Sequence, residues 1–163
     1  MSTASGDSSF AYGYKTIASG ERSIAMGINS AASGDCSISI GYLTTASGEC
    51  STAMGMGSRA SGVHSTAIGN NAVNASGNYS TAIGLNNLAY GNYSTAIGCS
   101  SYAYSDYSVA VGNSTMAYAA RSVAIGNSTT ASGLFSTAIG YNTTASGSYS
   151  TTMGVYTIAN KSS

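Results

Sequence analysis

The residues best suited to chemistry in this chain lie fourteen residues apart. Cys36 and Cys50 are followed, at the same interval, by His64. Thiolates and imidazoles at matched spacing are ligands of zinc sites, and two neighbouring thiols can form a disulfide. A zinc site needs further ligands, which the chain does not offer at this spacing. We therefore interpret these cysteines and Cys99 as unpaired small thiols, and a Cys36–Cys50 disulfide stays open as the alternative.

Four acidic residues repeat at the same interval, and paired carboxylates can act as general acids and bases or bind Ca²⁺. They directly follow a glycine, where we expect a solvated turn rather than a desolvated cleft. The serines recur in near-identical surroundings, so none is distinguished as a nucleophile. We predict no enzyme, no metal site and no cofactor, and we interpret the acids as turn residues: Asp7, Glu21, Asp35 and Glu49.

These spacings all come from one 14-residue repeat, Ala-Ser-Gly-x-x-Ser-Thr-Ala-Ile-Gly-x-x-x-x, in eleven consecutive copies between residues 4 and 158. Counted from the first alanine, Ala at position 1, Ser at position 6 and Gly at position 10 never vary. The fifth copy has one extra residue within 70–74, where we expect a small outward bulge in a turn. So short a period predicts a solenoid with one coil per copy, and a single domain over residues 1–163.

A glycine about every seven residues excludes helix and predicts two turns and two short strands per coil, with the glycines supplying positive φ. Side chains alternate along a strand, so positions 6, 8 and 10 share one side and positions 5, 7 and 9 the other. Small residues at positions 1, 6 and 8 should therefore fill a narrow interior. Position 9 must point outward and form an apolar ridge.

A ridge of this length is expected to be covered by another chain, and an identical solenoid offers a matching ridge at the same spacing. We therefore predict a homo-oligomer. Its interface should include the position 9 residues Ile40, Ile68, Ile83, Ile97, Val111, Ile125 and Ile139.

Aromatic residues gather at two further positions. At position 5 we expect rings of successive coils to stack on one another. Position 2 changes from Ser to Tyr in three successive copies, and two interpretations of this stretch stay open: a ligand contact site, or aromatic packing between neighbouring chains. The candidate contact residues are Tyr90, Tyr104, Tyr118, Tyr93 and Tyr107.

The composition of the chain limits the classes of partner that it could bind. Five basic and five acidic residues give a formal net charge of zero, whereas a nucleic-acid-binding surface needs a basic stripe. No stretch approaches the roughly 20 apolar residues of a membrane helix. The first residues also lack the charged and apolar regions of a signal peptide. We therefore expect no nucleic acid partner, no membrane insertion, and no signal peptide or anchor in the chain as given.

Ser-Val-Ala-Ile-Gly at 122–126, Ser-Thr-Ala-Ile-Gly at 65–69 and 80–84, and the recurring Ala-Ser-Gly resemble the head repeat of YadA-type trimeric autotransporter adhesins, over essentially the whole chain. The resemblance implies an all-β, left-handed parallel β-roll and a homotrimer with its isoleucines near a three-fold axis. It also implies adhesion to host matrix or cell surfaces. The family's neck, stalk and membrane barrel have no counterpart in this sequence.

Three functions stay open at this point. The first is an adhesin-like head, or a fibre or tip module on a cell or virion surface, which attaches to a host surface protein or glycan. The second is a self-assembling filament, since the open edges of end coils can pair with one another. The third is ice binding, suggested by the threonine column at position 7: Thr52, Thr66, Thr81, Thr95, Thr137 and Thr151.

Overall fold

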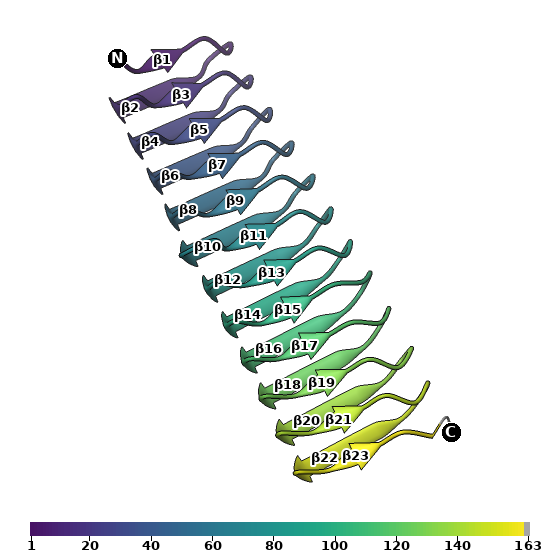
Figure 1. The fold of residues 1–163 in the computed structure, drawn as a ribbon. Helices are drawn as coiled ribbons and strands as arrows, with labels where there is room; N and C mark the ends of the chain where they lie inside the picture. Colours follow the sequence, from purple (N-terminus) through teal and green to yellow (C-terminus); the bar gives the residue numbers. More distant parts are fainter. Residues whose placement is uncertain (162–163) are drawn as a thin grey trace.

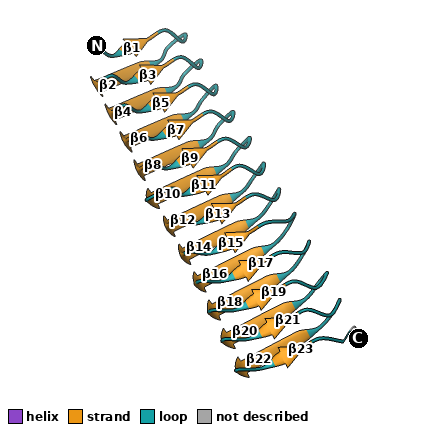
Figure 2. Cartoon of the chain, viewed as in Figure 1, coloured by secondary structure: helices purple, strands orange, loops and turns teal. Residues whose placement is uncertain are grey.

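The computed structural model describes residues 1–161, which form a parallel β-solenoid (Figure 1). Each 14-residue copy builds one coil with a five-residue strand and a two-residue strand. The long strands, from β2 (Phe10–Tyr14) to β22 (Thr151–Val155), form an 11-stranded parallel sheet. The short strands, from β1 (Thr3–Ala4) to β23 (Ile158–Ala159), form a 12-stranded parallel sheet. Figure 2 shows how turns join the two sheets within every coil.

The intervening strands follow the repeat without omission. The long ones are β4 (Ile24–Ile28), β6 (Ile38–Tyr42), β8 (Thr52–Met56), β10 (Thr66–Asn70), β12 (Thr81–Leu85), β14 (Thr95–Cys99), β16 (Val109–Asn113), β18 (Val123–Asn127) and β20 (Thr137–Tyr141). The short ones are β3 (Ile17–Ala18), β5 (Ala31–Ala32), β7 (Thr45–Ala46), β9 (Arg59–Ala60), β11 (Asn74–Ala75), β13 (Leu88–Ala89), β15 (Tyr102–Ala103), β17 (Met116–Ala117), β19 (Thr130–Ala131) and β21 (Thr144–Ala145). The predicted all-β solenoid with two short strands per coil is confirmed.

Neighbouring coils lie in register, so each repeat position becomes a column along the solenoid axis. In β10 and β12, for example, Ile68 pairs with Ile83 and Gly69 with Gly84. Hydrogen bonds between coils continue through the turns, where the Cys50 N–H donates to the Asp35 carbonyl at 2.8 Å. The stack is therefore stabilised mainly by contacts between adjacent coils, whose energies add along the axis.

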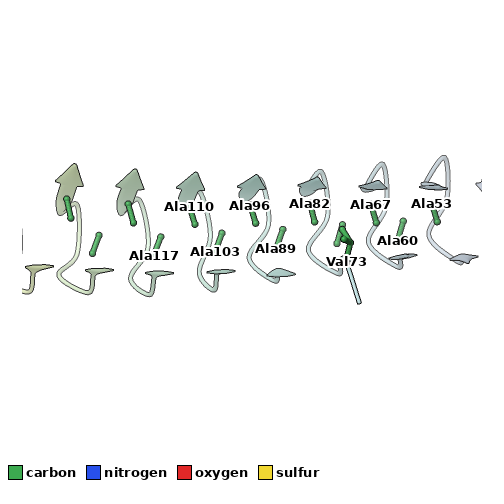
Figure 3. Close-up of a cluster of buried hydrophobic side chains, with 14 of the residues drawn as sticks. Ala53, Ala60, Ala67, Val73, Ala82, Ala89, Ala96, Ala103, Ala110 and Ala117 are labelled. Carbon is green, nitrogen blue, oxygen red and sulfur yellow. The ribbon is translucent and has the colours of Figure 1, made fainter. Parts of the chain in front are cut away.

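The interior is narrow and filled by small side chains, as their size predicts. Ala96 from the long-strand sheet and Ala103 from the short-strand sheet are both fully buried. Figure 3 shows two rows of alanine side chains pointing toward each other from the two sheets. The serines at position 6 are buried beside them, with the partial exception of Ser9 at the N-terminal end.

Position 13 forms a further interior column, which the sequence analysis missed. Its residues are mostly Ser and Thr, and those from Thr16 to Thr143 are almost completely buried. Some of their polar groups bond to the backbone: the amide of Asn87 donates to the carbonyls of Ile83 at 2.7 Å and Gly98 at 2.8 Å. The hydroxyl groups of Thr16 and Thr143, in contrast, are buried without a hydrogen-bond partner.

The turns differ from the sequence-based expectation. Glycine at position 10 does have positive φ, 134° at Gly112, but it lies within a long strand. Glycine at position 3 does not have positive φ. The left-handed residue of that turn is at position 5, as in Tyr93 with φ 56°. Position 3 favours glycine because a Cβ there, on Gly62 for instance, would lie 2.0 Å from the carbonyl oxygen of Gly77.

The extra residue of the fifth copy lies in the turn between β10 and β11. Asn71 and Ala72 are exposed and adopt successive left-handed conformations, with φ 58° and 61°. Val73 then returns to the interior, where it is fully buried (Figure 3). The insertion therefore leaves the register of the following strands unchanged, since Asn74 still pairs with Leu88.

Candidate interaction surfaces

The outer face of the long-strand sheet carries the predicted apolar ridge. Because side chains alternate, Ala96 in β14 points inward and its neighbour Ile97 outward. Ile97 is 37% exposed and Ile125 36% exposed, although each has an apolar neighbour on both sides in its column. The structure brings all seven predicted interface residues into this column; the other five are half-buried: Ile40, Ile68, Ile83, Val111 and Ile139.

Two flanking columns widen this face. Position 11 adds exposed side chains such as Ile28, Met56 and Leu85. Position 7 is aliphatic in Ile24 and Ile38, threonine in the next four coils, and aliphatic again at Val109. We call positions 7, 9 and 11 of the long strands the sheet face. Position 11 escaped the sequence analysis because its residue types vary along the stack, whereas position 9 is almost uniformly apolar.

The aromatic residues at position 5 stack into a ladder along one edge. Tyr93 lies between Tyr79 and Tyr107, with ring centroids 4.9 Å and 5.0 Å apart and planes within 4° of parallel. Their exposed fractions are near one half. The predicted stacking of this column is therefore confirmed, and each ring covers the faces of its neighbours while its edge meets solvent.

Two residues extend the ladder beyond the predicted tyrosines. His64 stacks on Tyr79 at 5.0 Å. At the other end, the guanidinium of Arg121 lies 5.5 Å from the ring centroid of Tyr107 and 5.1 Å from that of Phe135. Phe135 in turn stacks on Tyr149 at 5.1 Å. The ladder thus runs without a gap through seven coils, since a planar cation can replace a ring between two aromatic faces.

Removing one central ring should test what this ladder contributes to stability. We expect Tyr93→Ala to lower the free energy of unfolding by about 1–2 kcal/mol, because two aromatic pairs are lost at once. Arg22→Ala is the matched control at the same position, and its side chain has no aromatic neighbour in the column. Urea denaturation of both variants measures the effect. Equal losses would show that stacking is not the cause.

The tyrosines at position 2 form a second cluster on the same edge. Tyr104 and Tyr118 stack at 5.0 Å with parallel rings, and Tyr90 lies 5.9 Å from Tyr104 at a tilt of 40°. Burial raises the pKa of Tyr104, and the neighbouring Tyr118, Tyr102 and Tyr90 add to the shift. All five candidate contact residues belong to the turns that lead from a short strand to a long strand in three successive coils, and we call this group the tyrosine patch.

Two of the acidic residues at position 4, Asp35 and Asp106, have a structural role that the sequence analysis missed. The Asp35 carboxylate accepts a hydrogen bond from the backbone N–H of Glu21 at 2.9 Å. Asp106 accepts in the same way from Asn92 at 2.8 Å, and Asn92 accepts from Asn78 at 3.0 Å. Position 4 side chains thus satisfy turn N–H groups of the preceding coil.

Within residues 1–161, no cluster of three or more His, Cys, Asp or Glu side chains could hold a metal ion. Cys36, Cys50 and Cys99 are free thiols. Burial raises the pKa of Cys50, and the adjacent Cys36 thiol raises it further. The same part of the chain also contains no helix long and apolar enough to cross a membrane.

In-register coils with a small-residue interior and patterned outer columns define a parallel β-solenoid repeat protein, whose interactions take place on its surface. The family model described as the YadA head domain repeat matches residues 18–44, 32–58, 46–72, 75–99, 103–129 and 131–157. The chain therefore belongs to the YadA head-repeat family of adhesin heads. The resemblance noted in the sequence is confirmed.

One solved structure extends the comparison. The collagen-binding domain of the Yersinia adhesin YadA aligns with 90% of this chain and 67% of its own length, at 19% sequence identity and a TM-score of 0.35. A comparison with curated proteins gives no match.

Proposed function

We propose that this protein is a non-enzymatic adhesin head that assembles as a homotrimer through the sheet face and attaches to a host surface protein or glycan. The observation that carries the proposal is the apolar column at position 9, which remains on the outside of a solenoid whose interior is already full. An adhesin of this kind acts at a cell or virion surface, which is where we place it.

Side-by-side assembly follows from the regularity of the sheet face. Three identical chains around a three-fold axis present the same columns to one another, so every coil contacts its counterpart in the other chains. Covering one half-exposed isoleucine such as Ile97 or Ile125 stabilises the assembly by about 1 kcal/mol. Repeated along eleven coils, contributions of this size can offset the entropy lost when three chains associate.

The tyrosine patch is the attachment site that we propose. Its rings offer apolar edges and its phenol groups can donate and accept hydrogen bonds, with Asp106 and Arg121 as the only charges close by in sequence. Such a surface suits a neutral glycan or a polar protein segment better than a strongly charged partner. Three copies in one trimer would multiply weak individual contacts.

Replacing the three position 2 tyrosines tests this site. Tyr90→Ser, Tyr104→Ser and Tyr118→Ser together restore the residue that most other copies have, so the coils should still fold. We expect at least a tenfold loss of binding to immobilised matrix protein, with collagen as the first probe, or to a glycan array. The mass measured by light scattering should not change.

Tyr149→Ser is the matched control, because Tyr149 lies on the same edge but outside the tyrosine patch. It should leave binding intact. If the triple variant instead loses its oligomeric state, the tyrosines pack between chains and the contact-site proposal is wrong.

Ice binding is the second candidate. Thr52, Thr66, Thr81 and Thr95 form an unbroken in-register row of half-exposed side chains on the sheet face. Aliphatic residues interrupt the same column at Ile38 before the row and at Val109 after it. A measurement of thermal hysteresis decides this alternative, and we expect none.

A further inference from the structure

Cys36 and Cys50 occupy the same column in adjacent coils, and nothing in the proposed adhesin role uses them. We propose that they are a site of oxidative modification: on contact with a low-molecular-weight disulfide, such as oxidised glutathione, they form an intramolecular disulfide. This bond would covalently close one coil of the solenoid.

The backbone brings the two residues into register. Both have left-handed backbone conformations, with φ 56° at Cys36 and 52° at Cys50, so their Cα–Cβ bonds point in the same direction. The strands that follow pair Ile38 with Thr52. Adjacent parallel strands are about 4.8 Å apart, which is within the Cα–Cα range of about 4.4–6.8 Å that a disulfide spans.

The rings of the same column show how closely its side chains follow one another. Centroids of successive rings are 4.9–5.1 Å apart from His64 to Tyr107 and again between Phe135 and Tyr149. Because the Cβ atoms of a disulfide are about 3.5–4.5 Å apart, bond formation requires these two turns to approach by roughly 0.5 Å. Position 5 lies in a turn outside both sheets, so such a shift strains the hydrogen bond from the Cys50 N–H to the Asp35 carbonyl but leaves the paired strands in place.

The chemistry is a pair of thiol–disulfide exchanges. One cysteine thiolate attacks a sulfur of oxidised glutathione, forms a mixed disulfide and releases one glutathione thiolate. The second cysteine thiolate attacks the protein sulfur of that mixed disulfide, forms the Cys36–Cys50 bond and releases the second glutathione. Two protein thiols are oxidised, one glutathione disulfide is reduced to two glutathiones, and the two thiol protons pass by way of solvent to the released glutathione thiolates. Both side chains are half-buried and so remain accessible to the reagent.

Cys99 provides an internal control. It occupies position 11 on the sheet face, where its neighbours in the column are Leu85 and Asn113. No second thiol lies beside it, so oxidation at Cys99 can give only a mixed disulfide or a bond to another molecule.

The test treats the reduced full-length protein with oxidised glutathione and then digests it, without reduction, with trypsin and a glutamate-specific protease. Cleavage after Arg22, Glu49 and Arg59 separates residues 23–49 from residues 50–59. We expect these two peptides to stay joined, with a mass two hydrogens lower than their sum, and to separate on addition of a reductant. Separate peptides that each carry glutathione would overturn the proposal.

Two variants make the assignment specific. Cys50→Ser should leave Cys36 able to form only a mixed disulfide, whereas Cys99→Ser should leave the 36–50 bond intact. Serine already occupies position 5 at Ser8, so the repeat tolerates this replacement. Hydrogen exchange of the amides in residues 37–49 should slow by at least about tenfold in the oxidised protein, because the closed coil can no longer open locally. Unchanged exchange would contradict the covalent closure of that coil.

Discussion

Gly112→Ala is expected to lower the free energy of unfolding by more than about 3 kcal/mol. A Cβ on Gly112 would lie 1.9 Å from the carbonyl oxygen of Gly126 in the next coil. Neither atom can move aside, since the Cβ is bonded directly to the backbone of β16 and the oxygen belongs to the backbone of the paired strand β18. The coils would have to separate, which breaks ladder hydrogen bonds on both sides of the substitution. Chemical denaturation, followed by circular dichroism, measures the loss.

Gly154→Ala is the matched control for this prediction. Gly154 lies in the same column and also has positive φ, 117°, but a Cβ there would meet only the Thr157 side chain at 3.6 Å. It therefore carries the conformational cost of alanine without the clash between coils, and we expect a loss of about 1–2 kcal/mol. If the two variants are equally destabilised, position 10 requires glycine only because of its positive φ, and the clash of a Cβ with the next coil contributes nothing.

Ile97→Glu combined with Ile125→Glu is expected to abolish the proposed trimer. Around a three-fold axis each substitution would bring three carboxylates together in a desolvated environment, where like charges repel strongly. The exposed positions of both residues mean that the single chain should still fold, because the interior columns are untouched. Light scattering should give the mass of one chain, and the circular dichroism spectrum should remain that of the parent protein.

Thr130→Glu combined with Thr144→Glu provides the corresponding control on the short-strand sheet. Both threonines are half-exposed and point outward from β19 and β21. This variant should keep the mass of the parent protein. If the control variant dissociates and the sheet-face variant keeps the parent mass, the interface lies on the short-strand sheet and not on the sheet face.

Much of this fold follows directly from the sequence. The small residues at positions 1, 6 and 8 predict a thin interior, because larger side chains cannot fit between sheets joined by such short turns. The same reasoning places position 9 outside, where the structure has it.

Two features could not be predicted in this way. The column from Thr16 to Thr143 was missed because Ser and Thr are usually exposed, and the backbone carbonyls to which some members bond, such as those paired with Asn87, come together only in the assembled coil. The left-handed conformations of bulky residues such as Tyr93 also contradict local preference, which favours glycine there. Stacking along the ladder accompanies this strain, and that contact exists only between coils.

The candidate surfaces likewise include features that the sequence predicts and features that only the structure shows. The sheet face was predictable in its central column, position 9, where almost every residue is apolar, and not at position 11, where apolar and polar residues alternate irregularly. The continuation of the aromatic ladder through Arg121 required the structure, since nothing in the spacing distinguishes an arginine between two rings from a solvated one.

The mass of the wild-type protein in solution tests whether three chains assemble through the sheet face. Multi-angle light scattering during size-exclusion chromatography should give three times the 16.1 kDa of one chain, constant over a wide concentration range. A single-chain mass that persists up to millimolar concentration would contradict the account, because the sheet face would then be stable in water. A mass that grows continuously with concentration would also contradict it, in favour of end-to-end filaments.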